Sequence, residues 1–170
     1  MEFLDLAKER YSCRKLSDAP VEKEKIEKIL NAGLAAPTAV NKQPYKIWVL
    51  ESDEAVSNIA SVTRYTFGAK VFLLVGCRPD EAWVRRADGK NFAEIDGSIV
   101  ATHMMLEIHD LGLGSTWVGY FDAPKLKEIY PELKDYELIA LFPIGYPAED
   151  SEPALMHSVK KDRELTVKYL

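Results

Sequence analysis

The segment from Asn91 to Leu111 carries apolar side chains around most of its helical circumference, and no other feature limits the fold as strongly. The apolar positions are Ile95, Ile99, Val100, Met104, Met105, Leu106 and Ile108. A surface helix is apolar along one stripe, whereas a helix that is apolar on most sides is buried on most sides. One domain of 170 residues seldom encloses a helix so fully. We therefore expect this helix to lie at a homodimer interface and to end at Gly112.

Shorter patterns on both sides of this helix predict the other elements. Further helices are expected over 2–9, 20–31 and 122–130, and strands over 46–50, 71–76, 115–118 and 138–144. The last residues, 165–170, have the pattern of a strand or an extended arm. We expect one domain over residues 1–170, an α+β sandwich in which helices surround a central mixed, mostly antiparallel sheet.

Charge and hydropathy exclude two classes of partner. The net charge is −5 and no block of like charges occurs, which argues against nucleic acid because its binding requires a basic face. No apolar run reaches the roughly 18 residues of a membrane-spanning helix. The acidic residues near Phe3 also differ from the basic start of a signal peptide, so we expect a cytoplasmic protein.

The cysteines and histidines point to no disulfide and no metal site. Cys13 and Cys77 fit neither a disulfide framework nor a zinc spacing. Cys13 lies among basic residues that favour a thiolate, but we prefer to interpret it as a small neutral side chain packed beside a ligand loop. His103 and Glu107 are four residues apart and could pair on one helix face, but we interpret this histidine as structural and expect no metal.

Arg10, Ser12 and Arg14 alternate along the chain near the N-terminus. In an extended segment, alternate side chains point the same way, so all three could face one ligand. Arginine binds phosphate through two parallel hydrogen bonds, and a serine hydroxyl adds a further donor. The pattern predicts a small phosphorylated ligand, and a solvated surface loop is the alternative.

Four motifs in order along the chain resemble those of the nitroreductase family of FMN enzymes. They are 10–14 (Arg-Tyr-Ser-Cys-Arg), 36–45 (Ala-Pro-Thr-Ala-Val-Asn-Lys-Gln-Pro-Tyr), 112–122 (Gly-Leu-Gly-Ser-Thr-Trp-Val-Gly-Tyr-Phe-Asp), and Gly-Tyr-Pro at 145–147 followed by Lys-Asp-Arg at 161–163. Together they span roughly residues 8 to 165, almost the whole chain. The resemblance implies the nitroreductase-like fold, with the central helix at the dimer interface.

The resemblance also implies a set of FMN-binding residues. These are Arg10, Tyr11, Ser12, Arg14, Pro37, Thr38, Asn41, Gly119, Tyr120, Lys161 and Arg163. Arg10 and Ser12 would hold the phosphate and ribityl chain, and Arg14 would stabilise the reduced flavin. Lys160 could replace Lys161 in the phosphate site. The segment with Pro37, Thr38 and Asn41 would reach the FMN of the partner subunit, and the backbone at Gly119 and Tyr120 would lie near flavin N5.

The implied activity is an FMN-dependent oxidoreductase that takes hydride from NAD(P)H and reduces a small acceptor such as a nitroaromatic or a quinone. No side chain is identified as a proton donor. The chain lacks the longer insertion that often shapes the substrate pocket in this family, and the region Asp80–Lys90 is what corresponds to it. Two alternatives stay open: an FMN-binding carrier or sensor without nicotinamide turnover, and a specialised branch that performs dehalogenation or flavin cleavage.

Overall fold

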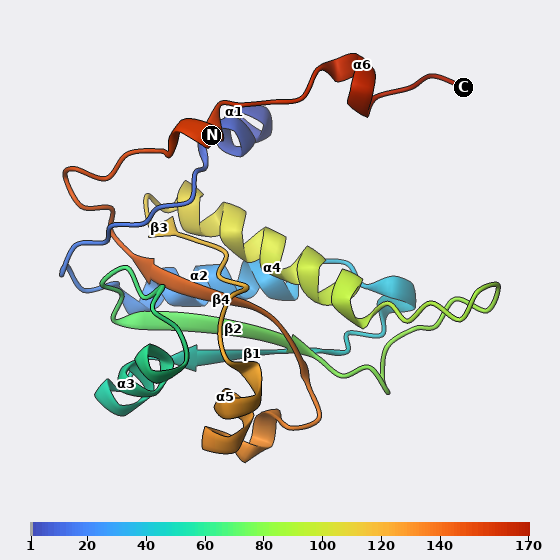
Figure 1. Ribbon diagram of the computed structural model, residues 1–170, viewed down its shortest axis with the longest axis horizontal. Coiled ribbons are helices and arrows are strands. Elements are labelled where there is room, and N and C mark those ends of the chain that lie inside the picture. The colour runs from blue at the N-terminus through green and yellow to red at the C-terminus, as the bar shows by residue number, and fades with distance from the viewer. Residues whose placement is uncertain (1) are drawn as a thin grey trace.

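The computed structural model describes residues 2–170 and has a four-stranded sheet between two layers of helices (Figure 1). The strands are β1 Tyr45–Leu50, β2 Val71–Cys77, β3 Gly114–Ser115 and β4 Glu137–Gly145. The helices are α1 Phe3–Glu9, α2 Lys23–Leu34, α3 Asp53–Val62, α4 Ala93–Asp110, α5 Ala123–Ile129 and α6 Arg163–Thr166. Three short 3-10 turns are η1 Ala39–Asn41, η2 Pro131–Leu133 and η3 Leu155–His157.

The strand order is β1-β2-β4-β3, and each pair of neighbouring strands is antiparallel. Tyr45 pairs with Cys77, which in turn pairs with Glu137, so the starts of β1 and β4 lie at the same end of the sheet. Gly114 pairs with Gly145 at the opposite end. The predicted α+β class with a mostly antiparallel sheet is confirmed.

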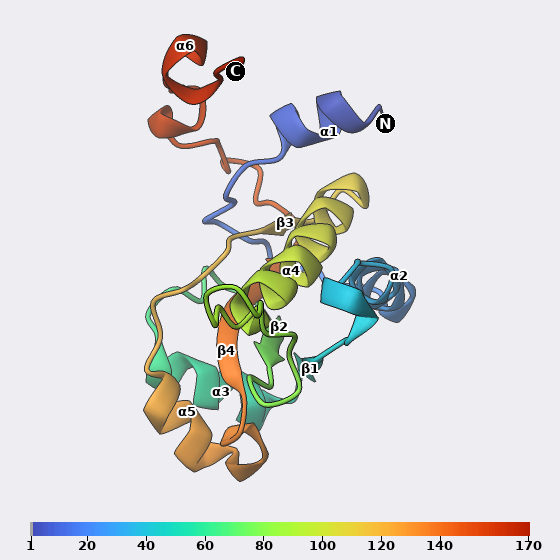
Figure 2. The ribbon, with the colours of Figure 1, turned by 90° about the vertical axis from the view of Figure 1, so that its right-hand side faces the viewer.

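Two hydrophobic cores lie on the two faces of the sheet, because successive strand residues point to opposite sides. Leu73 and Phe142 pack with Met104 under α2 and α4. Phe72 and Leu141 pack on the other face, under α3 and α5. Viewed from the side, α2 and α4 lie on one side of the strands, and α3 and α5 lie on the other (Figure 2). β2 is buried throughout because helices cover both of its faces.

The central helix α4 turns one face to the sheet and leaves another partly open. Val100, Met104 and Ile108 are completely or almost completely buried. The helix lies close to α2, where a Cβ added at Gly33 would come 2.9 Å from Met104 Cγ. Ile95, Ile99, Met105 and Leu106, which the periodicity predicts to be buried, are only partly covered within one chain.

Several predicted boundaries differ from the structure. The helix expected over 20–31 begins at Lys23, because Glu22 has extended backbone and precedes the first turn. Of the strand expected over 115–118, only Ser115 lies in a strand, which is β3. Val118 forms an isolated bridge to Leu141. Helix α3 over 53–62 lies where no helix is predicted, although Ser52 caps it by accepting a hydrogen bond from Ala55 N.

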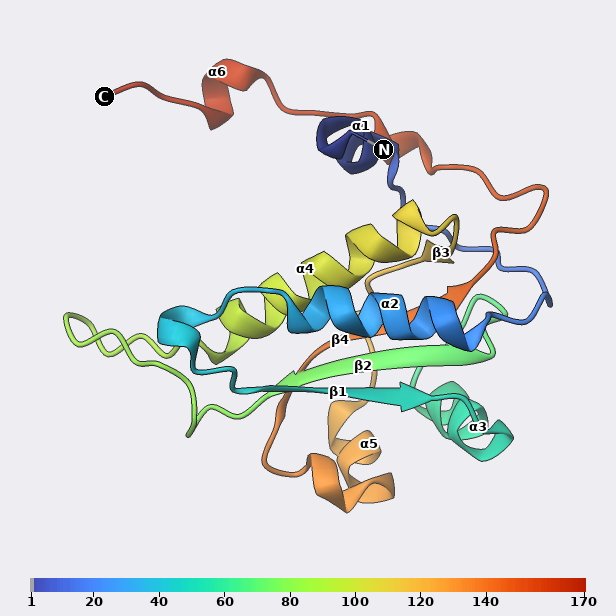
Figure 3. The same cartoon turned by 180° about the vertical axis from the view of Figure 1, so that it is seen from behind.

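Helix α1 and the C-terminal segment lie on the same side of the molecule, away from the sheet, and the chain then continues past α6 to a C-terminus that projects outward (Figures 1 and 3). Residues 163–166 form α6 instead of entering a strand, and the exposed segment 167–170 follows as an extended arm. Within residues 2–170, no helix is long and apolar enough to cross a membrane.

Candidate functional site

The segment carrying Arg10, Ser12 and Arg14 runs beside β3 and the residues that follow it. Ser12 forms a parallel bridge with Ser115. Cys13 N donates to Ser115 O at 2.9 Å, and Thr116 Oγ1 donates to Cys13 O at 2.6 Å. These bonds hold the segment extended, which is the conformation the alternating pattern requires.

Tyr11 and Cys13 point to the opposite side from the arginines. Tyr11 Oη lies 3.3 Å from Ser151 Oγ, and Cys13 Sγ lies 3.2 Å from the same oxygen. Burial raises the pKa of Tyr11. Cys13 is 1% exposed and packs against the segment after β4. Tyr11, which the resemblance includes among the FMN-binding residues, thus contacts Ser151 through its hydroxyl, while its ring lies edge-on to that of His157 with 6.4 Å between the ring centres.

Arg10, Ser12 and Arg14 line one cavity of about 270 Å³, which we call the basic cavity. Its other lining residues come from the end of the chain: Ala154, Met156, His157 and Lys160. Within residues 2–170, neither arginine forms an ion pair. The cavity thus combines cations without a neutralising carboxylate, which suits a phosphate group.

The two remaining cationic candidates lie elsewhere. Lys161 and Arg163 are exposed and do not line the basic cavity. The Arg163 guanidinium donates to Tyr169 Oη at 2.9 Å. Of the two lysines that the sequence left as alternatives, Lys160 is the one at the basic cavity.

Arg14 also borders a second cavity of about 250 Å³, which we call the aromatic cavity. Its other lining residues are Tyr65, Phe67, Thr116, Trp117, Val118, Gly119 and Tyr120. A Cβ added at Gly119 would meet nothing within 4 Å, so the backbone there is open to a ligand. Tyr120 is 79% exposed and its ring faces that of Tyr65 edge-on at 6.0 Å.

Tyr65 and Phe67 of the aromatic wall lie outside the four sequence motifs. Tyr65 Oη accepts a hydrogen bond from Arg64 Nη2 at 2.9 Å, and the guanidinium also lies 5.0 Å from the ring centre. Phe67 adopts a left-handed φ of 52° at the same cavity. No sequence pattern around His157 indicates that this residue lines the basic cavity.

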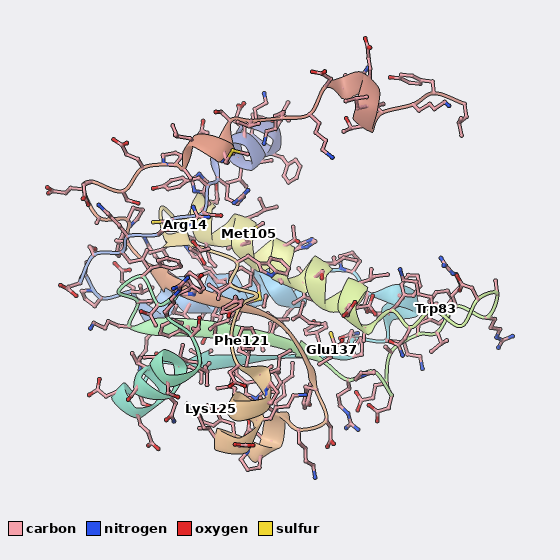
Figure 4. All side chains as sticks on the ribbon, viewed as in Figure 1. Arg14, Trp83, Met105, Phe121, Lys125 and Glu137 are labelled. Carbon is pink, nitrogen blue, oxygen red and sulfur yellow. The ribbon has the colours of Figure 1, made fainter. Side chains whose placement is uncertain are left out.

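Pro37, Thr38 and Asn41 lie at the opposite end of the sheet from the basic cavity. Their loop leads into β1, whose start is level with Glu137, whereas the basic cavity lies at the Gly145 end. The nine residues of β4 span roughly 27 Å between these ends. Arg14 and Glu137 mark the two ends in Figure 4, with Trp83 farther out on the same side as Glu137. One chain therefore does not bring this loop to its own basic cavity.

The loop itself is well ordered by internal hydrogen bonds. Gln43 N donates to Thr38 Oγ1 and Gln43 Nε2 donates to Asn41 Oδ1, both at 3.0 Å. These bonds account for the polar character of Thr38, Asn41 and Gln43, which a plain helix end would not need.

No group of three or more His, Cys, Asp or Glu side chains in the described chain could hold a metal ion. His103 Nδ1 lies 3.0 Å from Ile99 O.

Comparison with known proteins gives one consistent result. The nitroreductase family model matches residues 7–67 and 63–146. A Methanothermobacter thermautotrophicus protein, named as a candidate NADH dehydrogenase/NAD(P)H nitroreductase, is 30% identical over 88% of this chain and 80% of its own length. A crystal structure of a nitroreductase family protein from Clostridium difficile 630 superposes with a TM-score of 0.92 at 36% identity, covering 99% of this chain and 98% of that chain.

A second similar solved structure is a complex with a ligand. It is a candidate nitroreductase in complex with FMN from Desulfovibrio desulfuricans, with a TM-score of 0.84 at 24% identity, covering 100% of this chain and 97% of that chain. At this level of identity the likeness extends to the fold alone.

Proposed function

Because this chain belongs to the nitroreductase family, we propose that it is an FMN-dependent oxidoreductase that uses NAD(P)H to reduce a small acceptor such as a nitroaromatic or a quinone. The observation that carries the proposal is the position of Arg14, which borders both the basic and the aromatic cavity. A ligand with a phosphate at one end and a planar ring at the other would use both cavities together.

The residues present suit the phosphate end of FMN. Arg10 and Lys160 supply positive charge from opposite ends of the chain, and Ser12 supplies a hydroxyl. Because no carboxylate of residues 2–170 pairs with Arg10 or Arg14, their donors stay available to an anion. Charge-assisted hydrogen bonds of this kind are about twice as strong as neutral ones.

The residues present also suit the ring end. Gly119 leaves open space where a side chain would project, so backbone can lie directly against a planar ring. When bound, FMN would accept hydride from NAD(P)H at N5 and pass it to the acceptor. Arg14 would hold a positive charge beside the ring, where negative charge develops.

We further propose a homodimer of single-domain subunits with the flavin sites at the interface. The loop of Thr38 and Asn41 leads into the end of the sheet that lies roughly 27 Å along β4 from the end beside its own basic cavity, which favours a role at the flavin of another subunit. The partly covered Ile95, Ile99 and Leu106 on α4 give an apolar surface on which a second chain could pack. A cytoplasmic location also stays a prediction.

An absorbance spectrum of the purified protein tests the function, followed by anaerobic addition of NADH and then of NADPH. Flavin bands that bleach with a nicotinamide support the oxidoreductase and identify its donor. Bands that stay unchanged favour the carrier or sensor. A colourless protein that fails to take up added FMN would contradict the cofactor assignment. Light scattering after size exclusion tests the dimer, and a monomer that retains FMN would remove the cross-subunit role of Thr38 and Asn41.

A further inference from the structure

A buried carboxylate on α4 holds the loop that follows α2. Asp96 is 0% exposed, and its Oδ1 accepts a hydrogen bond from Ala39 N at 2.9 Å. Its Oδ2 is also buried and has no hydrogen-bond partner among residues 2–170. A buried carboxylate with an incomplete set of partners is costly to the fold, so its presence here calls for a role beyond packing.

The surroundings of Asp96 leave it little freedom to move. A Cβ added at the next residue, Gly97, would come 2.7 Å from Ile139 Cγ1 and 2.8 Å from Cys77 Sγ, so α4 touches the sheet closely at this point. Burial, and next the neighbouring Asp96 carboxyl, raises the pKa of Cys77 to about 12. Asp96 is therefore a fixed acceptor, anchored to the sheet through α4.

The loop on the other side of this bond has a backbone that needs support. Val40, Asn41 and Gln43 have left-handed φ angles of 47°, 55° and 50°. For Val40 the conformation is particularly unfavourable because its side chain is branched at Cβ, and that side chain is 70% exposed, so packing does not enforce it. Strained backbone of this kind persists only where surrounding bonds hold it, and it often marks a functional site.

We propose that Asp96 is a positioning residue that, through Ala39 N, fixes the orientation in which Thr38 and Asn41 meet the flavin of the partner subunit. The inference rests on the proposed function, because it gives this loop its target in the other chain. Asp96 lies at the end of α4 far from the basic cavity of its own subunit, so its effect on a bound flavin passes through the loop.

The first test compares two substitutions of the same side chain. Asp96→Ala removes the acceptor, and we expect it to weaken FMN binding by about 10- to 100-fold, as for loss of a hydrogen bond to a charged group. Asp96→Asn keeps an oxygen for Ala39 N, and we expect FMN binding within about threefold of the parent protein. FMN dissociation constants are measured by quenching of flavin fluorescence, and circular dichroism checks that both variants are folded.

A substitution on the loop side tests the same bond without touching α4. Ala39→Pro removes the N–H donor, and Thr38 already has the extended φ of −129° and ψ of 160° that a residue before proline adopts. We expect a loss of FMN affinity similar to that of Asp96→Ala. The double variant should be no weaker than either single variant, because both remove one bond. Additive losses would mean that Asp96 acts by another route, and parent-like binding in both single variants would overturn the inference.

A heterodimer separates action on the partner's flavin from general loss of structure. One subunit carries Asp96→Ala and the other carries Arg10→Ala, each with a different affinity tag. If the loop acts across the interface, the basic cavity of the Asp96→Ala chain meets the intact loop of its partner, and one site per heterodimer binds FMN with parent affinity. If Asp96 serves only its own subunit, no site recovers and the inference fails. Failure of the parent protein itself to bind FMN would instead refute the proposed function.

Discussion

Replacing Gly114 with alanine is the sharpest test of how the sheet edge supports the basic cavity. A Cβ at this position would lie 2.6 Å from Cys13 Sγ and 2.8 Å from Cys13 Cβ. Ordinary contacts begin near 3.4 Å, so the two approaches are 0.8 and 0.6 Å too short. The Cys13 Cβ is bonded directly to Cα, so no side-chain rotation can move it away. The extended segment itself must therefore move.

The expected cost follows from what that movement disturbs. Overpacking of a tight interior costs about 1–3 kcal/mol. A shift of this size would also stretch the bond from Cys13 N to Ser115 O, now 2.9 Å, and the loss of one such bond costs about 1 kcal/mol. We expect the Gly114→Ala protein to lose about 2–4 kcal/mol of unfolding free energy, which lowers Tm by about 5–15 °C. Because the same segment carries Arg10 and Ser12, FMN affinity should fall with it.

Urea unfolding of the cofactor-free protein and an FMN titration measure the two effects. Cys13→Ala provides the matched background, since it removes the Sγ contact but keeps the Cβ contact. Gly114→Ala should cost about 1 kcal/mol less in that background, and a double-mutant cycle measures the difference. An unchanged unfolding midpoint for Gly114→Ala, or a cost that is equal in both backgrounds, would refute the reasoning.

Three further predictions address the cavities and the core. Arg10→Ala should weaken FMN binding by about 10- to 100-fold in a titration, whereas Lys161→Ala, outside the basic cavity, should leave it within about twofold. Gly119→Ala should change the unfolding free energy of the cofactor-free protein by less than about 0.5 kcal/mol, because nothing lies within 4 Å, yet weaken FMN binding about tenfold. The raised pKa of Cys77, about 12 against an ordinary 9.0, means that the unfolded chain loses this proton first. Its stabilising contribution is therefore complete below pH 9 and is lost as the pH rises towards 12. Unfolding free energies measured from pH 8 to 10.5 should fall less steeply in Cys77→Ala than in the parent protein.

The sequence was sufficient for the elements whose pattern is strong and local. The apolar strands β2 and β4 and the long helix α4 lie close to where periodicity predicts them, because burial on both faces of the sheet requires continuous apolar runs. α3 was missed although Ser52 is a standard cap and Ala55, Ile59 and Val62 share one face. Its signal is short, and short apolar patterns are ambiguous without the neighbouring sheet.

The site was harder to predict because its residues meet only in the folded chain. The alternation of Arg10, Ser12 and Arg14 was readable because an extended backbone fixes the directions of its side chains. Nothing local distinguishes Lys160 from Lys161, since the choice depends on how the segment after β4 returns to the start of the chain. Asp96 was equally hidden, as its partner Ala39 is 57 positions away.

The walls of the basic cavity come from residues 10–14 and 154–160, so the pocket closes only when the two ends of the chain meet. During synthesis, every strand and both cores can be complete once Gly145 has emerged, while half of the pocket is still missing. If the basic cavity holds FMN as proposed, the cofactor would bind fully only after residues 154–160 have been made and folded back onto residues 10–14. A chain that ends after Gly145 would keep all four strands but would lack one wall of the basic cavity.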